Sequence, residues 1–469
     1  MEIVWHRRDL RVSDNAALSE CEHALPVFVL DDDVLRHASP PRVAFLLDAL
    51  RALRDDYRAL GGDLVVRRGD PREVLPRLAD GHDATVRWNR GYSGLARERD
   101  DEVRDALADE GVGFSGYKDA VLHEPDEIFT NAGDPYSVYT YYHRKWKERE
   151  KEGVYATPET IVETDDAGEI PTLDALGFDA PEADVPDAGT DGARALLDGF
   201  LAEDVYEYDE ARDYPARRCT SRLSPHLKFG TIGVREVWQA TERAKDDAPD
   251  DEARENVEEF QAQLGWREFY TQVLYHSPSV VTRNYKEYEN KIDWRDDEDE
   301  IEAWKQGETG YPIVDAGMRQ LRQEAFVHNR VRMIVASFLT KDLLADWRVG
   351  YDHYRRMLVD HDTANDNGGW QWAASTGTDA QPYFRIFNPM TQGERYDEDA
   401  EYIKEYVPEL RGVPAEKIHS WHELSDEERD ELASDYPAPV VDHSERRDEA
   451  LSMFEKARGE NRDDDGGED

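Results

Sequence analysis

Residues 1–131 alternate short apolar runs with longer amphipathic stretches, and this order constrains the fold more than any other feature of the chain. The apolar runs have the length of buried strands, and the stretches between them carry apolar residues at helical spacing. Strands that alternate with helices predict a doubly wound parallel sheet, Rossmann-like in class. The predicted strands are Ile3–Trp5, Leu25–Leu30, Leu64–Val66 and Ala84–Trp88, and the predicted helices are Pro41–Leu60 and Gly94–Glu110.

The pattern changes after this α/β domain, which lacks the GxGxxG turn of a standard dinucleotide site. Residues 132–191 are acidic and rich in proline and glycine, which predicts an interdomain linker. Residues 192–457 show mostly helical spacing, as in Arg330–Leu344, and predict a larger all-α domain. Residues 458–469 are polar and acidic and predict a disordered tail.

The chain is strongly acidic, with 105 Asp and Glu against 58 Lys and Arg and a net charge of -47. The carboxylates are spread along the whole sequence, which indicates a solvated surface adapted to molar salt, where the Debye length is about 3 Å. An acidic protein at ordinary salt is the alternative. Such charge argues against generic nucleic-acid binding but leaves room for DNA recognition through an extruded, stacked base. Arginines gather locally, as at Arg330–Arg332, and predict a positive strip.

Cysteine content and hydropathy indicate the compartment. Cys21 and Cys219 are too few for a disulfide framework or a zinc site, so we expect no metal. The N-terminus turns charged at once, and no apolar stretch has the length of a membrane span. We therefore expect a soluble, cytoplasmic monomer.

The most informative motif is Trp370–Asp379, entered through Asn367–Gly369 and followed by Arg385–Pro389. Two tryptophans flanked by glycine and small residues suit a pocket in which flat rings lie close to the backbone. Together with Thr220–Ser224 and Trp266–Phe269, this motif resembles the photolyase/cryptochrome flavoproteins over nearly the whole chain. Within the family, the resemblance favours the class I cyclobutane pyrimidine dimer photolyases, and it implies FAD bound in the helical domain.

Hydroxyl groups and an arginine precede a helical segment within Tyr208–Gly230. The start of such a helix offers N–H groups to a phosphate, although an ordinary helix cap is the better explanation of these residues when they are taken alone. The resemblance implies that they clamp FAD. The clamp residues are Tyr208, Thr220, Ser221, Arg222, Leu223 and Ser224.

The acidic loop Asp360–Gly369 does not fit a calcium-binding EF-hand, because glycine at position six and glutamate at position twelve are missing. The resemblance implies that Asp360 and Asp362 face the flavin ring and that Arg332 pairs with Asp360. Asp366 is implied as a cofactor-binding and catalytic residue. It stands where bacterial relatives usually carry asparagine and plant cryptochromes carry aspartate. A buried, protonated carboxyl can donate a proton to the flavin, whereas an ionised one repels its anionic reduced form.

Gln263 and Trp266 lie one helical turn apart, and an indole can stack on an extruded pyrimidine with about 1–3 kcal/mol per base. Taken singly, a tryptophan is more often a core residue. Gln263 stands where repair relatives usually carry glutamate, and where (6-4) photolyases and animal cryptochromes carry glutamine. The resemblance implies a set of residues that contact damaged DNA. They are Gln263, Trp266, Arg267, Asn329, Met333 and Trp372.

Two further sets follow from the resemblance. Trp294, Trp347 and Trp370 match the family's chain of electron-donating tryptophans, although three unrelated core indoles are the simpler explanation of their sequence spacing. His6–Arg11 and Pro135–Tyr139 resemble the antenna domain. Because Ser93 replaces the glutamate that is usual in folate-binding members, we expect 8-hydroxy-5-deazaflavin as the antenna, with methenyltetrahydrofolate as the alternative.

The resemblance thus implies light-dependent repair of cyclobutane pyrimidine dimers in UV-damaged DNA, by electron transfer from excited reduced FAD to a flipped-out lesion. Such an enzyme is a carbon–carbon lyase. A blue-light signalling cryptochrome is one alternative, which Asp366 favours and the short tail disfavours. A (6-4) photolyase is the other, but it would carry two histidines where this chain has Asn329 and Met333.

Overall fold

A parallel sheet forms the N-terminal part of the computed structural model, which describes residues 1–158 and 160–459. The strand order is β3-β2-β1-β4-β5, and every neighbouring pair is parallel. The Rossmann-like prediction is therefore confirmed. The strands are β1 (Glu2–His6), β2 (Ala24–Leu30), β3 (Val65–Arg68), β4 (Thr85–Asn89) and β5 (Phe114–Tyr117).

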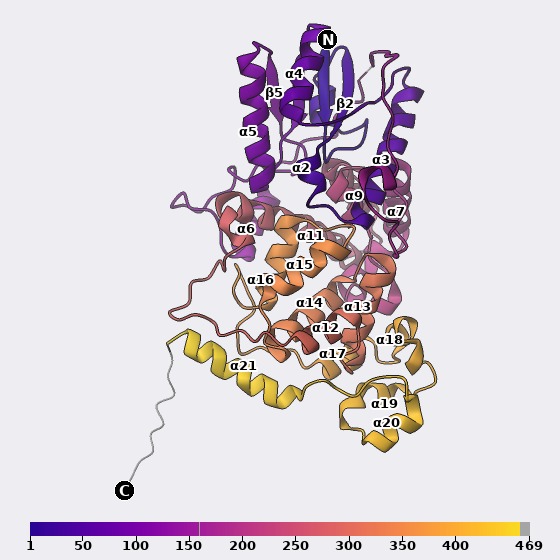
Figure 1. Cartoon of the computed structure of the whole chain (residues 1–469), viewed down its shortest axis with the longest axis vertical. Coiled ribbons are helices and arrows are strands. Elements are labelled where there is room, and N and C mark those ends of the chain that lie inside the picture. Colours follow the sequence, from indigo (N-terminus) through magenta and orange to yellow (C-terminus); the bar gives the residue numbers. More distant parts are fainter. Residues whose placement is uncertain (159, 460–469) are drawn as a thin grey trace. The chain divides into compact units, whose positions relative to one another are not determined.

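The strand order reverses between β1 and β4, and this reversal places helices on both faces of the sheet (Figure 1). α1 (Ala16–Ser19) and α3 (Pro40–Ala59) make the connections from β1 to β2 and from β2 to β3. α4 (Pro71–His82) and α5 (Gly94–Asp109) make those from β3 to β4 and from β4 to β5. Because parallel crossovers are right-handed, the two pairs cover opposite faces, and the carboxyl ends of β1 and β4 diverge into a crevice.

From Thr190 onward the described chain is mostly helical, as the sequence predicts for residues 192–457. Short 3-10 turns join many of the helices. The remaining helices are α2 (Asp32–Leu35), α6 (Tyr139–Glu148), α7 (Thr190–Ala202), α8 (Tyr208–Ala211), α9 (Ser224–Phe229), α10 (Val234–Asp247), α11 (Asp251–His276), α12 (Glu298–Gln306), α13 (Pro312–Glu324), α14 (Asn329–Ser337), the π-helix η5 (Phe338–Asp342), α15 (Trp347–Met357), α16 (Thr363–Ala373), α17 (Pro389–Tyr396), α18 (Glu401–Tyr406), α19 (Ala415–His419), α20 (Asp426–Ala433) and α21 (His443–Ala457).

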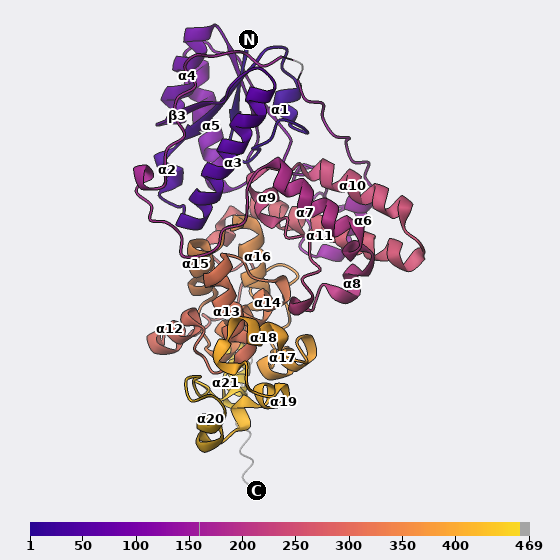
Figure 2. The ribbon, with the colours of Figure 1, turned by 90° about the vertical axis from the view of Figure 1, so that its right-hand side faces the viewer.

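The chain divides into two compact units. The first unit comprises Met1–Arg212, Cys219–Val281 and Arg355–Asn365, and so joins the sheet to α6–α11. The second unit comprises Asp213–Arg218, Thr282–Tyr354 and the described chain from Asp366 onward. In the first unit, α6 and α10 both pack on α11 and share one apolar core with it (Figure 2). α6 falls within the segment that the sequence predicts as a linker.

The structure differs from the sequence-based expectations at three places. β5 was not predicted, because Phe114–Tyr117 is short and contains serine and glycine. Residues 360–369 are predicted as a loop, yet α16 begins at Thr363. The amphipathic stretch 330–344 is not a single α-helix, since α14 ends at Ser337 and the chain continues as the π-helix η5. The predicted tail lies almost entirely outside the described residues.

Within residues 1–158 and 160–459, no helix is long and apolar enough to cross a membrane. Over the same ranges, no group of three or more His, Cys, Asp or Glu side chains is arranged to hold a metal ion. In the described part of the chain, the two buried cysteines, Cys21 and Cys219, form no disulfide.

Candidate functional site

The face of α11 that carries Gln263 and Trp266 forms one part of the candidate site. Trp266 is partly buried and stacks on Tyr139 of α6, with ring centroids 3.6 Å apart and planes 13° from parallel. The Tyr139 hydroxyl donates to the carbonyl oxygen of Ala262 at 2.5 Å. Gly265 leaves room for this ring, because a Cβ there would lie 3.0 Å from the hydroxyl oxygen. Tyr139 therefore supports the Trp266 indole from behind.

Arg267 and Glu268 attach α11 to the loop that follows β5. Arg267 Nη1 donates to the carbonyl oxygen of Ala120 at 2.7 Å. The Glu268 carboxylate accepts from the backbone N–H of His123 at 3.2 Å and from Trp146 Nε1 at 2.7 Å. Burial raises the pKa of Glu268, and these donors oppose that shift. Both side chains thus stabilise the first unit, and the DNA contact of Arg267 stays a prediction.

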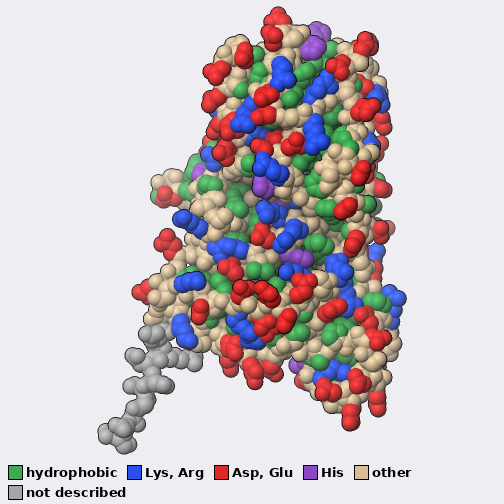
Figure 3. All heavy atoms as spheres, in the orientation of Figure 1, with side chains coloured by type: hydrophobic (Ala, Val, Ile, Leu, Met, Phe, Trp, Pro, Cys, Tyr) green, Lys and Arg blue, Asp and Glu red, His purple; other side chains and the backbone are tan. Residues whose placement is uncertain are grey.

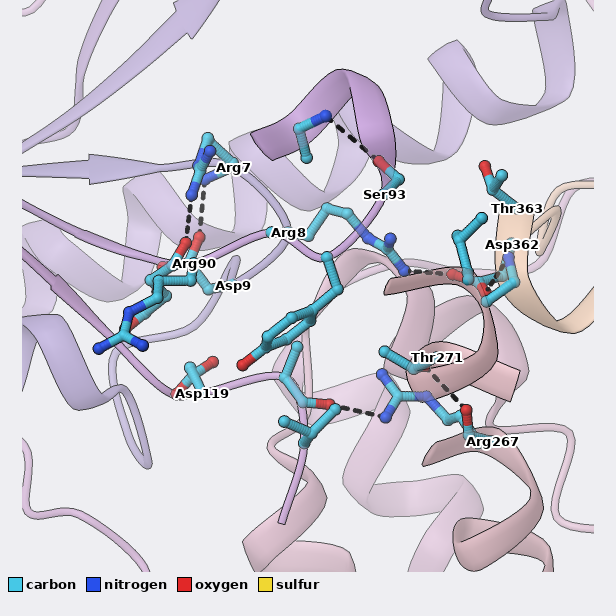
Figure 4. A pocket seen from close by; sticks show the side chains of 18 of the residues that line it. Arg7, Arg8, Asp9, Arg90, Ser93, Asp119, Arg267, Thr271, Asp362 and Thr363 are labelled. Carbon is cyan, nitrogen blue, oxygen red and sulfur yellow. Dashed lines mark hydrogen bonds and ion pairs between the residues drawn. The ribbon is translucent and has the colours of Figure 1, made fainter. Parts of the chain in front are cut away.

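A cavity lies in the crevice between β1 and β4, at the point where the strand order reverses. Arg7, Arg8 and Asp9 line it from the end of β1, and residues 89–93 line it from the end of β4. Open α/β sheets bind ligands at such a point, because side chains from two diverging strand ends face one gap. Figure 4 shows the labelled arginines and carboxylates of the cavity, including Arg267.

Asp362, which the sequence predicts beside the flavin, lines this cavity. Its carboxylate accepts from Arg8 Nη2 at 2.7 Å (Figure 4) and from two backbone N–H groups at the start of α16, each at 3.1 Å. Burial alone would raise the pKa of Asp362, but Arg8, Lys228 and Arg267 hold it well below its usual range. Asp362 is therefore a fixed negative charge in the wall of the cavity.

Two residues of the predicted FAD clamp meet in the first unit. Ser224 Oγ donates to Asp360 Oδ2 at 2.6 Å. Ser224 begins α9, and the N-cap residue Leu223 makes no side-chain capping bond. The ordinary helix cap is therefore absent here, so the Ser224 hydroxyl serves Asp360 instead. The pairing of Arg332 with Asp360 stays a prediction.

The other clamp residues lie around the same turn. Thr220, Ser221 and Arg222 are partly exposed, and Tyr208 is buried. Arg222 has a φ of 50°, in the left-handed region that side chains with a Cβ rarely adopt. Such positions concentrate at ligand sites, because the surrounding structure must hold them in place. α9 has only six residues, so hydroxyl groups rather than a long helix dipole are available to a phosphate.

Trp370 is one of the enclosed residues among those predicted to be functional in the second unit. It is 2% exposed, and it meets Tyr354 and Trp304 edge-on at centroid distances of 5.0 and 6.0 Å. Gly350 of α15 admits the indole, because a Cβ there would lie 2.1 Å from a ring carbon of Trp370. Trp370 therefore packs on α15 one turn after Trp347, the first residue of that helix.

The other two members of the predicted tryptophan chain differ in exposure. Trp347 is fully buried, donates from Nε1 to Asn284 Oδ1 at 2.9 Å and lies under the guanidinium of Arg348, 4.6 Å from the ring centroid. Trp294 is partly exposed and meets Phe454 edge-on at 5.8 Å. Exposure thus rises from Trp370 and Trp347 to Trp294.

The remaining predicted residues of the second unit lie on α14 and α16. Arg332 Nη1 lies 3.6 Å from Asp366 Oδ1, and the Asp366 side chain is 7% exposed. Asn329 Nδ2 lies 3.8 Å from Met333 Sδ, as one helical turn places them. Trp372 is partly exposed. The predicted amide, guanidinium and thioether therefore do share α14.

An arginine and tyrosine cluster, which we define as Arg330, Arg395, Tyr396 and Tyr214, also belongs to the second unit. The guanidinium carbons of Arg330 and Arg395 lie 4.4 and 5.1 Å from the Tyr396 ring centroid. Tyr214 meets Tyr396 at 6.2 Å, and Arg330 pairs with Asp213. Asp213 therefore partly neutralises the predicted positive strip. The two tyrosines of the cluster were not predicted, because they lie far from Arg330 in sequence.

Two family models match the chain. Residues 2–161 match a model described as DNA photolyase, and residues 260–456 match one described as the FAD binding domain of DNA photolyase. The chain belongs to the DNA photolyase family. The two models cover the sheet, most of α11 and nearly all of the second unit, including both indoles described above, Trp266 and Trp370.

Similar proteins match along nearly the whole chain. The deoxyribodipyrimidine photo-lyase of the halophilic archaeon Halobacterium salinarum is 61% identical over 480 residues, which cover 98% of this chain and 100% of the relative. The crystal structure of a class III photolyase from Agrobacterium tumefaciens has a TM-score of 0.90 and 36% identity, with 98% of each chain covered. An archaeal photolyase from Sulfolobus tokodaii, solved with two FAD molecules, has a TM-score of 0.85 and 32% identity, covering 97% of this chain and 100% of that one.

Proposed function

We propose that this photolyase-family chain repairs cyclobutane pyrimidine dimers in UV-damaged DNA in a light-dependent reaction. The observation that carries the proposal is the supported indole of Trp266, one turn from Gln263 on α11, in a chain 61% identical to a deoxyribodipyrimidine photo-lyase. A partly exposed indole with one face covered offers the other face to an extruded base. The proposed DNA contacts are Gln263, Trp266, Arg267, Asn329, Met333 and Trp372.

FAD is the proposed cofactor, and when bound it supplies the light-excited electron that opens the cyclobutane ring. The donor groups present fit such a ligand. The hydroxyls of Thr220 and Ser221 are accessible at the strained turn of Arg222, and Ser224 orients the carboxylate of Asp360. The proposed cofactor residues are Tyr208, Thr220, Ser221, Arg222, Leu223, Ser224, Arg332, Asp360, Asp362 and Asp366.

Asp366 and Arg332 have a combined role in this proposal. A buried carboxylate would repel an anionic ligand, but the guanidinium of Arg332 lies 3.6 Å away and offsets its charge. Asp366 is also the one residue that favours the signalling alternative. In the proposal, Trp294, Trp347 and Trp370 carry electrons inward, because Trp294 is partly exposed to the solvent whereas Trp347 and Trp370 are buried.

We further propose that the cavity between β1 and β4 holds the antenna, 8-hydroxy-5-deazaflavin rather than methenyltetrahydrofolate. Arg7, Arg8 and Arg99 line it, and cationic walls favour a chromophore with an acidic hydroxyl group. Ser93 at the same wall carries no charge that would oppose it. The absorption spectrum of the apoprotein reconstituted with each chromophore tests this choice.

The surface supports a protein that works at molar salt. Figure 3 shows Asp and Glu side chains over the visible face of the chain, with Lys and Arg among them. The net charge of -47 requires screening by counterions. Two buried cysteines that form no disulfide, Cys21 and Cys219, suit a reducing compartment, and we propose that the protein is a cytoplasmic monomer.

The proposal is tested by repair of an oligonucleotide that carries one defined thymine dimer. The FAD-loaded, reduced protein is mixed with it in molar salt and illuminated, and restored thymines are measured by chromatography. Repair in the light and none in the dark is the expected result. Absence of repair with reduced flavin bound would reject the proposal in favour of signalling.

A further inference from the structure

We infer that Glu259 fixes the orientation of the Gln263 amide, so that α11 presents a hydrogen-bond acceptor and selects pyrimidines that carry an N3–H. The inference rests on the proposed function, since it concerns how the same site reads a lesion. Glu259 lies one helical turn before Gln263, on the face of α11 that also carries Trp266.

The contacts of Gln263 define its orientation. Gln263 Nε2 lies 3.2 Å from the backbone oxygen of Glu259 and 3.0 Å from its carboxylate Oε1. Both partners are acceptors, so the amide must turn its NH2 group towards them. The opposite orientation would place the amide oxygen against two other oxygens, and it is therefore excluded by the chemistry of the neighbours.

Glu259 is itself held in place. Arg212 Nη1 donates to Glu259 Oε1 at 2.5 Å, and Arg212 Nη2 lies 3.1 Å from Asp209 Oδ1. Burial alone would lower the pKa of Arg212, but Glu259 raises it above its usual value. The carboxylate is thus a charged acceptor in a fixed position, and it competes for the NH2 group of Gln263 better than a neutral group would.

The free end of the amide is its oxygen. Among the described residues, no group donates to Gln263 Oε1, and the side chain is partly exposed one turn from the supported Trp266. Thymine and uracil in a dimer carry an N3–H donor, whereas cytosine has an acceptor at N3. An acceptor that faces another acceptor leaves both unpaired in a desolvated site, which weakens binding about tenfold or more.

The test is dark binding of the FAD-loaded full chain to three oligonucleotides, each with one cyclobutane dimer of thymine, of uracil or of freshly prepared cytosine. Uracil keeps the N3–H but lacks the methyl group, so it separates the two effects. We expect thymine and uracil dimers to bind alike and cytosine dimers about tenfold more weakly. Equal binding of all three by the unaltered protein would overturn the inference.

The decisive variant is Glu259→Gln. Its side chain can donate as well as accept, so only the backbone oxygen of residue 259 still favours the original orientation of the Gln263 amide, and the preference for thymine over cytosine should fall. Glu255→Gln removes the same charge from an exposed site one turn earlier on α11 and should keep the preference. Retention of the full preference in Glu259→Gln would overturn the inference.

A second variant covers the case in which Glu259→Gln loses its fold, which circular dichroism and flavin content would reveal. Gln263→Ala removes the proposed acceptor and leaves Glu259 unaltered, so the preference for dimers with an N3–H should fall to near unity. Retention of the full preference by Gln263→Ala would overturn the inference. If the unaltered protein binds no dimer more tightly than undamaged DNA, the proposed function fails together with the inference, and that result is distinct from binding without discrimination.

Discussion

Trp266 in the first unit and Trp370 in the second unit are packed in opposite ways. Trp266 is partly exposed and lies parallel to Tyr139, 3.6 Å between centroids. Trp370 is 2% exposed and meets Tyr354 and Trp304 at 78° and 75°. A supported and accessible indole can stack on a base, whereas an enclosed one can exchange electrons with neighbouring rings but cannot touch a substrate.

The polar surroundings of the two indoles also differ, and the difference agrees with base stacking by Trp266 and electron exchange by Trp370. Trp266 shares its helix face with Gln263 and Glu259, whose hydrogen-bonding groups suit recognition of a base edge. Trp370 Nε1 is buried and has no hydrogen-bond partner in the described part of the chain. A dry N–H with no base beside it favours electron transfer without loss of the proton. These surroundings suit the proposed roles, which are binding for Trp266 and electron supply for Trp370.

The largest expected effect is that of Trp370→Phe, which should abolish nearly all photoreduction of bound flavin. Phenylalanine fills most of the space of the indole but is much harder to oxidise. The measurement is the flavin absorption spectrum during illumination with an external reductant. Trp421→Phe, at another buried tryptophan of the second unit, is the control and should photoreduce normally. Normal photoreduction by Trp370→Phe would show that Trp370 is not needed to supply electrons to the flavin.

A pH experiment asks whether the second unit can be perturbed alone. Asp397 is 5% exposed, and burial raises its pKa from 3.8 to about 6 despite hydrogen bonds from the N–H groups of Tyr402 and Ile403. Because the folded-state pKa lies above the unfolded value, its stabilising contribution is full below about pH 4 and is lost as the pH rises through about 6.

Asp397→Asn removes this titration, so its free energy of unfolding relative to the unaltered protein should be about 2–3 kcal/mol more favourable at pH 7 than below pH 4. The amide has one oxygen for the two N–H groups, and this loss should be the same at both pH values. Denaturant titrations at the two pH values measure the difference. The affinity for damaged DNA should not change, since Asp397 belongs to the second unit and the Trp266 indole to the first. A change in that affinity would show that the two regions are not independent.

Trp266→Ala should weaken binding to dimer-containing DNA by about 1–3 kcal/mol, with flavin content unchanged, because it removes one stacking surface. Binding in the dark, measured by fluorescence anisotropy in molar salt, gives the size of the effect. Trp266→Phe keeps a ring on Tyr139 and should recover most of the affinity. Loss of flavin in Trp266→Ala would place this residue in the cofactor site instead.

The smallest expected effect is that of Tyr139→Phe, which keeps the stacked ring but removes the hydrogen bond to Ala262. We expect a loss of stability of about 0.5–1.5 kcal/mol and a weaker effect on DNA binding than that of Trp266→Ala. Tyr141→Phe on the same helix is the matched control, since Tyr141 is 55% exposed. An effect on DNA binding as large as that of Trp266→Ala would mean that the hydroxyl itself acts in recognition.

The sequence predicted much of the fold because β1–β4 each contain a run of buried apolar residues or, in β4, buried Val86 and Trp88. Four of the strands in the sheet overlap their predicted ranges, whereas β5, with Ser115 and Gly116, carries no such signal. The start of α16 was missed because its cap, Asp362, belongs to a run of carboxylates that also suits a loop. Local sequence patterns therefore predicted the elements whose positions follow from the burial of apolar residues.

The site was less predictable, because its contacts join distant parts of the chain. Nothing in the run Pro135–Tyr139 indicates that Tyr139 stacks on Trp266, and Asp362 gives no sign that Arg8 will hold it. Glu259 could have been found, since it lies one turn before Gln263 on a predicted helix. The roles of the clamp and of the tryptophan chain remain predictions that the experiments above address.

The most direct test of the division between binding and electron supply is light-driven repair by chemically reduced Trp370→Phe. Chemical reduction makes the tryptophan chain unnecessary, so we predict repair of a defined thymine dimer at the rate of the unaltered protein. Chemically reduced Trp266→Ala should repair poorly at limiting DNA. Failure of chemically reduced Trp370→Phe to repair, with flavin and DNA bound, would contradict the account.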